Sequence, residues 1–228
     1  AQSLVMHSYQ NPLDTISTNA LGSASILEAL RDFKKPVVAV MITSDKAYDN
    51  VEWSWGYRET DRLGGKDPYS ASKGMAEIAI RSYVESYFKY AESNVRVGIT
   101  RAGNVIGGGD WAQDRIVPDC VRSWSQNDPA KIRNPSSTRP WQHGLEPLSG
   151  YLTLGASLRE NGDYHGEAYN FGPRMDQNYS VSELIAEMSK FWGNVSWEDI
   201  SENNDKMHEA GLLKLNCDKA LSDLNWSS

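Results

Sequence analysis

Large apolar residues recur along the chain with two spacings that alternate. Between residues 15 and 33 they return at helical intervals, which predicts an amphipathic helix that ends before Pro36. The next segment, Val37–Ile42, is an uninterrupted apolar run, and such runs are typical of strands buried on both faces of a parallel sheet. A helix followed by a buried strand is therefore the first expected unit.

Helical and strand-like segments continue in turn along the rest of the chain. Ser180 and Glu183 form the S-x-x-E pattern of a capping box, which marks the start of another helix. Residues 1–9 show neither pattern. We expect helices at about 69–92, 116–124, 145–160 and from 180 onward, strands at 95–101 and 168–171, and loops at 50–67 and 103–111. This alternation predicts an α/β fold built on a doubly wound parallel sheet.

The composition is that of a folded protein. Of the 228 residues, 39% are hydrophobic and 23% are charged, which excludes a disordered or collagen-like chain. No apolar run approaches the roughly 20 residues of a membrane span, and no signal-peptide pattern is visible. The net charge of −7 argues against nucleic acid or a membrane as the main partner, but it leaves room for a small anionic ligand held by a few arginines.

The cysteines and histidines indicate neither a disulfide framework nor a metal site. Cys120 and Cys217 lie far apart, so we expect reduced thiols and a cytoplasmic protein. None of the four histidines has the spacing of metal ligands, so no metal is expected.

Tyr69 and Lys73 are the first candidates for chemistry. A spacing of four residues places both side chains on one face of the predicted helix, about 5–6 Å apart at Cβ. An ammonium beside a phenol favours the phenolate, which can act as a general base toward an alcohol. Lowering a tyrosine pKa from about 10 to about 7 requires roughly 4 kcal/mol. The alternative is an ordinary pair on a solvated helix.

A second candidate group follows the strand that ends at Ile42. Ser44, Asp45 and Lys46 lie at its carboxyl end, where open α/β sheets bind their ligands. The serine hydroxyl can orient a substrate hydroxyl, the carboxyl can deliver a proton, and the lysine can accept one or stabilise charge. Alternatively, these residues only cap or turn the chain.

Together these residues resemble the catalytic group of the extended short-chain dehydrogenase/reductases. Within them the chain is similar to the nucleotide-sugar 4,6-dehydratases, and Ser44-Asp45-Lys46 favours those that act on CDP-glucose, since a dTDP-glucose enzyme would be expected to show Thr-Asp-Glu there. The matching stretches lie in the family's order over nearly the whole chain, at 43–46, 56–61, 67–73, 103–111, 139–143 and 169–173.

The resemblance implies a Rossmann-like domain and a smaller C-terminal substrate domain. Residues 1–105 and 145–172 are expected in the NAD-binding domain, and residues 106–144 and 173–228 in the nucleotide-sugar-binding domain. The family's opening βαβ unit with its glycine-rich turn has no counterpart, so we expect that part of the fold to be missing. The pattern Gly107-x-Gly109-x-x-Ala112 fits such a turn by letters only and is rejected, because it lies in the substrate part and lacks an acidic ribose partner.

The resemblance also implies a reaction sequence. Tyr69 as phenolate removes the proton of the sugar 4-hydroxyl while NAD⁺ takes the hydride from C4. Lys73, with the cationic nicotinamide, lowers the Tyr69 pKa and holds the nicotinamide ribose, and Ser44 binds the 4-oxygen. Asp45 is the acid for the departing 6-hydroxyl, and Lys46 is the candidate for the C5 proton. Hydride then returns to C6, and the product is CDP-4-keto-6-deoxy-D-glucose, a precursor in deoxysugar and lipopolysaccharide O-antigen biosynthesis.

Binding residues follow from the same resemblance. Gln2 and Val105 join Tyr69 and Lys73 in the expected NAD site. Substrate contacts are expected from Asn104, Arg115 and Arg139, and the two arginines suit a pyrophosphate because the planar guanidinium donates two hydrogen bonds at once. The alternative for each arginine is a surface ion pair, while Arg101 at a strand end is expected to be structural.

Two other functions remain possible, and an oligomer is also expected. A nucleotide-sugar 4-epimerase of the same fold would use Ser44, Tyr69 and Lys73 but would not need Asp45 and Lys46. A truncated, non-catalytic fragment would keep a sugar-nucleotide pocket without binding NAD, since the pyrophosphate-binding helix N-terminus is absent. A homodimer or higher oligomer is expected through helices 15–33 and 69–92, whose outer faces are predicted to carry Ile80, Tyr83 and Tyr87.

Overall fold

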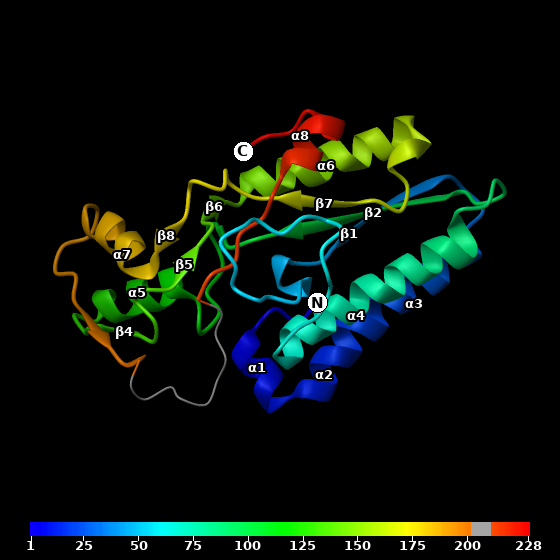
Figure 1. Ribbon diagram of the computed structural model, residues 1–228. Helices are drawn as coiled ribbons and strands as arrows, with labels where there is room; N and C mark the ends of the chain where they lie inside the picture. The colour runs from blue at the N-terminus through cyan, green and yellow to red at the C-terminus, as the bar shows by residue number, and fades with distance from the viewer. Residues whose placement is uncertain (202–210) are drawn as a thin grey trace.

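The computed structural model describes residues 1–201 and 211–228. Its centre is a parallel sheet of three strands in the order β1–β2–β7 (Figure 1). β1 spans Val37–Ile42, β2 spans Val95–Ala102 and β7 spans Ala168–Phe171. The register pairs Ile42 with Thr100 and Ala102 with Phe171, so all three carboxyl ends lie at one edge.

Helices cover both faces of this sheet (Figure 1). On one face lie α3 (Gly22–Arg31) and α4 (Pro68–Tyr83), and on the other lie α6 (Leu145–Glu160) and α8 (Asp218–Leu224). Apolar side chains from the strands form one core on each face of the sheet. On one face Val97 and Ile99 pack with Leu27 and Ile80, and on the other Val38 and Val40 pack on the side of α6. These layers confirm the predicted doubly wound α/β fold.

A smaller part lies beyond the carboxyl ends of the strands (Figure 1). It has its own core of Cys120, Trp124, Ala130, Ile132 and Ile185. Its elements are α5 (Ile116–Ser125), α7 (Val181–Ser189), the parallel pair β4 (Ala130–Ile132) and β9 (Trp197–Asp199), and the antiparallel pair β5 (Thr138–Arg139) and β8 (Tyr179–Ser180). The parallel pair β3 (Val105–Ile106) and β6 (Gln142–His143) connects it to the sheet region. The last helix, α8, packs instead on α6 and β7, although it falls within the range 173–228 expected in the smaller domain.

Several element boundaries match the sequence pattern, and others do not. β1, α6 and β7 begin and end where the pattern predicts, and Ser180 and Glu183 form the capping box. The helix expected at 15–33 consists of α2 (Pro12–Ile16), a π-helical turn (Ser17–Leu21) and α3, and α4 also continues into a π-helical turn (Val84–Phe88). Residues 1–9 were expected to be irregular, but α1 spans Val5–Gln10.

Two expectations about burial were wrong. Ile80 lies on the inner face of α4, fully buried against Leu27, and not on an outer face. β1 is half-buried along most of its length because it forms an edge of the described sheet, and Ile42 is 58% exposed. Within the described ranges, none of the helices is both long enough and apolar enough to cross a membrane.

Candidate active site

The strand ends bring the predicted catalytic residues together. β1 stops at Ile42, and the chain passes through Ser44 into a 3-10 turn, Asp45–Ala47, that packs against α4. The Asp67 side chain caps α4 by accepting a hydrogen bond from the Ser70 backbone N–H at 2.9 Å. Tyr69 and Lys73 therefore occupy the first turns of α4, beside the residues that follow β1.

Ser44, Tyr69 and Lys73 form a buried group. The Ser44 hydroxyl donates to Asp45 Oδ1 at 2.9 Å and accepts from the Lys46 backbone N–H at 3.2 Å. The hydroxyls of Ser44 and Tyr69 interact, and Lys73 Nζ lies 6.0 Å from the centroid of the Tyr69 ring. All three side chains are at least nine-tenths buried, so a reacting hydroxyl placed here is shielded from water.

The electrostatics differ from the sequence expectation in one respect. Burial raises the pKa of Tyr69, and the hydroxyl of Ser44 and the charge of Arg115 only partly oppose that effect. Burial also lowers the pKa of Lys73, against the charge of Glu77. The expected depression of the Tyr69 pKa is therefore not present in the chain alone, because loss of solvation exceeds the opposing effects of Ser44 and Arg115.

Asp45 has the environment of a proton donor. Its Oδ2 is buried and has no hydrogen-bond partner among the described residues. Gly103 lies beside it: a Cβ on Gly103 would be in ordinary contact with Oδ2 at 3.6 Å, but would lie only 2.9 Å from Pro140 Cγ. Burial raises the pKa of Asp45, while Lys46, Ser44 and Arg139 act in the opposite direction. The carboxyl thus keeps its proton to higher pH than an ordinary aspartate.

The two predicted phosphate-binding arginines lie near enough to this group for their charges to act on it. Arg115 immediately precedes α5, donates to Ser3 Oγ at 3.1 Å, and lies 3.5 Å from Asp110, so the predicted alternative of an ion pair is also present. Arg139 in β5 is buried and donates to the Thr138 carbonyl at 2.9 Å. The charge of Arg115 acts on Tyr69 and that of Arg139 acts on Asp45.

The other predicted binding residues surround the same edge of the sheet. Asn104 follows β2, and its carbonyl accepts a hydrogen bond from the Gln142 backbone N–H at 3.0 Å. Val105 begins β3 and is 47% exposed. The side chain of Gln2 donates to Leu4 O and to Thr15 Oγ1, so it is held within the N-terminal segment.

One residue that links these parts was missed in the sequence. Asn19 is almost completely buried, and its amide donates to the Gln2 carbonyl and to Ser72 Oγ, each at 2.9 Å. Ser72 lies between Tyr69 and Lys73 in the sequence, so Asn19 connects the N-terminal segment to the turns of α4 that carry these two residues. The available signal was an asparagine inside a predicted helix, where its side chain is unfavourable unless it has a specific partner.

The remaining motifs lie apart from this site. Gly107, Gly108 and Gly109 are exposed, a Cβ added to any of them would meet no atom within 4 Å beyond the adjacent residues, and α5 begins only at Ile116, so they do not open a helix. No group of three or more His, Cys, Asp or Glu side chains that could hold a metal occurs in residues 1–201 and 211–228. His208 lies outside the described residues.

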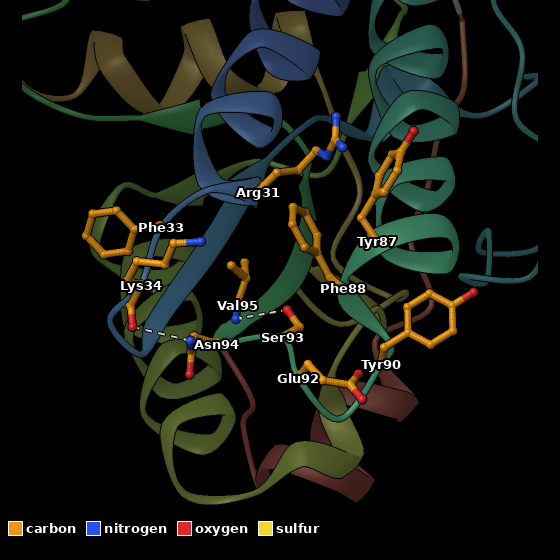
Figure 2. A pocket seen from close by; sticks show the side chains of 10 residues that line it. All are labelled: Arg31, Phe33, Lys34, Tyr87, Phe88, Tyr90, Glu92, Ser93, Asn94 and Val95. Atoms are coloured by element: carbon orange, nitrogen blue, oxygen red, sulfur yellow. Dashed lines mark hydrogen bonds between the residues drawn. The ribbon is translucent and has the colours of Figure 1, made fainter.

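A surface hollow of about 410 Å³ lies at the opposite end of the sheet (Figure 2). Arg31, Tyr87 and Val95 are among its lining residues, and the Arg31 guanidinium lies 4.2 Å from the centre of the Tyr87 ring. The hollow borders the amino end of β2, whereas parallel sheets bind ligands at their carboxyl ends. The group of Ser44, Tyr69 and Lys73 at the carboxyl ends is therefore the candidate active site.

The known proteins that resemble this chain include nucleotide-sugar dehydratases and a nucleotide-sugar epimerase. The chain is 47% identical to the CDP-glucose 4,6-dehydratase of Salmonella typhimurium strain LT2, over 99% of this chain and 64% of the relative. Its fold matches a dTDP-glucose 4,6-dehydratase from Streptomyces venezuelae with a TM-score of 0.80 at 20% identity, covering 99% of this chain and 65% of that one. It also matches a UDP-glucuronic acid 4-epimerase from Bacillus cereus with a TM-score of 0.76 at 18% identity, covering 93% and 62%.

The chain therefore spans slightly less than two thirds of the length of these relatives. A family model described as GDP-mannose 4,6 dehydratase matches residues 1–228, which is the whole chain. This match agrees with the resemblance drawn from Ser44, Tyr69 and Lys73, and with a sheet whose strand ends bring those three residues together. The chain belongs to the GDP-mannose 4,6 dehydratase family.

Proposed function

We propose that this protein catalyses the NAD-dependent dehydration of CDP-D-glucose to CDP-4-keto-6-deoxy-D-glucose. The observation that carries the proposal is the buried group at the carboxyl end of β1, in which Ser44 and Tyr69 lie beside an aspartic acid with an unpartnered oxygen. The 47% identity to a CDP-glucose 4,6-dehydratase supports the choice of nucleotide.

The residues present fit the nicotinamide end of NAD⁺. Tyr69 and Lys73 offer a hydroxyl and an ammonium in a buried setting, and Val105 offers an exposed apolar surface at the same edge of the sheet. Bound NAD⁺ would supply a hydride acceptor and a positive charge next to Tyr69. Such a charge is the contribution that the Tyr69 phenolate lacks in the chain alone, where burial raises the pKa of Tyr69.

The first step is removal of the proton from the sugar 4-hydroxyl. Tyr69 accepts this proton, and Ser44 holds the 4-oxygen through its hydroxyl. Lys73 stabilises the phenolate by its charge. The hydride on C4 would pass to bound NAD⁺. The 4-keto group that results makes the C5 proton acidic, and this prepares the sugar for elimination.

The second step is loss of water across C5 and C6. Lys46, in its neutral form, accepts the C5 proton, the C6–oxygen bond breaks, and Asp45 gives its proton to the departing hydroxyl, so one water leaves. Lys46 then returns its proton to C5, and the hydride would return from the reduced cofactor to C6, which gives the 6-deoxy product. The assignment of Asp45 uses the direction of its pKa, which burial raises, because a carboxyl that holds its proton more tightly is better suited to be the general acid than an ordinary aspartate. Arg115, Arg139 and Asn104 hold the nucleotide diphosphate.

A nucleotide-sugar 4-epimerase is the second candidate, since one such enzyme shares the fold. An epimerase also needs Ser44, Tyr69 and Lys73, but it eliminates no water and needs no acid at the 6-hydroxyl. The buried and unpartnered Asp45 Oδ2 therefore favours the dehydratase. A non-catalytic sugar-nucleotide-binding fragment is the third candidate.

One competition experiment separates these functions. The protein and NAD⁺ are mixed with CDP-, dTDP-, GDP- and UDP-glucose together, and each sugar is followed by mass spectrometry. Loss of water from CDP-glucose is the expected result. Loss from another nucleotide keeps the chemistry and contradicts the specificity. Conversion to an epimer of unchanged mass, detected by chromatography, favours the epimerase, and no change at all favours the binding fragment.

The proposal also covers the oligomeric state of the protein and its location in the cell. We propose a homodimer formed through α3 and α4, whose outward sides carry the exposed residues Ile26, Met75 and Ile78. We also propose a cytoplasmic location, which is supported by two free thiols at Cys120 and Cys217.

A further inference from the structure

A buried ion pair lies next to the group of Ser44, Tyr69 and Lys73. Glu77 on α4 and Arg101 on β2 are both fully buried. Arg101 Nε donates to Glu77 Oε1 at 2.7 Å, and its Nη2 donates to Oε2, so the guanidinium holds the carboxylate with two parallel bonds. Arg101 Nη1 donates to the Tyr48 hydroxyl at 2.6 Å. The pair is thus also bonded to Tyr48, the residue that follows the 3-10 turn Asp45–Ala47.

The Glu77 carboxylate is connected to the proposed active site in two ways. Glu77 lies one helical turn beyond Lys73 on α4, so the two side chains share a face of the helix. Glu77 Oε1 also accepts a hydrogen bond at 2.7 Å from the hydroxyl of Thr43, the residue that precedes Ser44. One oxygen therefore connects the helix that carries Lys73 with the strand end that carries Ser44.

We propose that Glu77 is a positioning residue for the reaction: held by Arg101, its carboxylate keeps the Lys73 ammonium charged and in place and, through Thr43, fixes Ser44. The inference rests on the proposed function, because it assigns a role in the same site. Glu77 touches neither substrate nor cofactor and acts only through Lys73 and Thr43.

The charges around Lys73 support this role. Tyr69 lies on the same helix, and Asp45 and Lys46 lie on the 3-10 turn packed against α4. Of these groups, Glu77 is the one whose charge opposes the lowering of the Lys73 pKa by burial. A buried ammonium without a nearby carboxylate loses its proton readily. A carboxylate at position 77 therefore maintains the positive charge that the Tyr69 phenolate requires.

The test measures Lys73 and Ser44 directly and needs no nucleotide sugar. In protein labelled with ¹³C at lysine Cε, the Lys73 signal is assigned with Lys73→Arg and titrated by NMR. We expect Glu77→Gln to lower the Lys73 pKa by at least about one unit. The matched control is Glu85→Gln, which removes a carboxylate that is paired with exposed Lys89 on the helical turn after α4. It should leave the Lys73 pKa unchanged.

A second variant tests the connection to Ser44. Thr43→Val keeps the ion pair but removes the hydroxyl, so the Lys73 pKa should stay in place. The Lys46 backbone N–H, which donates to Ser44 Oγ, should then exchange with deuterium about tenfold faster than in wild type. Unchanged exchange in Thr43→Val overturns the connection between Glu77 and Ser44.

The remaining outcomes also decide the proposal. If Glu77→Gln does not fold, the double variant Glu77→Gln/Arg101→Gln is titrated instead, since it leaves no unpaired buried charge. An unchanged Lys73 pKa in either folded variant overturns the proposal. Failure of both variants to fold also overturns it, because the pair is then a requirement of the fold alone. Failure of the water-loss assay contradicts the proposed function without altering these readouts.

Discussion

At the scale of single residues, Asp45 is the side chain that, in the proposed reaction, distinguishes dehydration from simple oxidation. Asp45→Asn keeps the shape of the side chain but removes the proton it can donate. We expect loss of water from CDP-glucose to fall about 100- to 10,000-fold. Oxidation at C4 should persist, because Tyr69, Ser44 and Lys73 are unchanged, and reduced nicotinamide should accumulate in a single turnover. Its near-ultraviolet absorbance and the mass of the sugar check this prediction, and an equal fall of both half-reactions would contradict it.

Asp45 should also influence how stability depends on pH. Burial raises its pKa in the folded chain above the unfolded value near 3.9, so the folded state binds this proton more tightly. As pH rises above about 4, Asp45 ionises in the unfolded chain while the folded state still holds its proton, so wild type should lose free energy of unfolding relative to Asp45→Asn. The difference should stop growing above the folded pKa. Urea unfolding of both proteins between about pH 4 and pH 8 measures it, and a difference that shrinks with rising pH contradicts the assignment.

Some site residues could be predicted from the sequence because local patterns mark them, and others could not because they depend on contacts between distant positions. Ser44, Tyr69 and Lys73 could be found because each follows a strand end or begins a helix, and local pattern marks such positions. Asn19 and Glu77 act through contacts with Ser72 and Thr43, which are 53 and 34 positions away in sequence, and no local pattern reports such pairs. Glu77 could be suspected only as a charged residue on the buried face of α4.

At the scale of elements, the close approach of α6 to β7 depends on Gly150. A Cβ at Gly150 would lie 2.2 Å from Phe171 Cδ1, a distance that forces the helix or the ring to move. Gly150→Ala should therefore lower the free energy of unfolding by about 1–3 kcal/mol. Gly155 lies on the same helix, and a Cβ there would meet only Val40 Cγ2, at 3.5 Å. Gly155→Ala should be neutral or stabilising by up to about 1 kcal/mol, because alanine favours helix. Chemical denaturation compares the two, and equal effects contradict the packing argument.

The elements themselves differed in how well the sequence predicted them. β1, β7 and α6 could be placed because their apolar residues form unbroken or strongly periodic runs. α1 and α8 were missed because each is only about two turns long, and tertiary contacts rather than periodicity stabilise them. Ile80 was assigned to the wrong face of α4, since helical spacing shows which residues share a face but not which face meets the sheet.

At the scale of the whole molecule, the two helical layers differ in how their outward sides are expected to be used. On α3 and α4, Ile26 is 57% exposed and Ile78 is 60% exposed, and the proposed dimer would cover both. Ile78→Lys would place a charge in that contact, and two symmetric copies would bring the like charges close together. We expect it to shift the protein from dimer to monomer in sedimentation velocity. Leu152→Lys is the matched control, since Leu152 on α6 is 77% exposed on the opposite face of the sheet and should leave the dimer intact. A dimer that survives Ile78→Lys but dissociates with Leu152→Lys places the contact on the α6 layer instead.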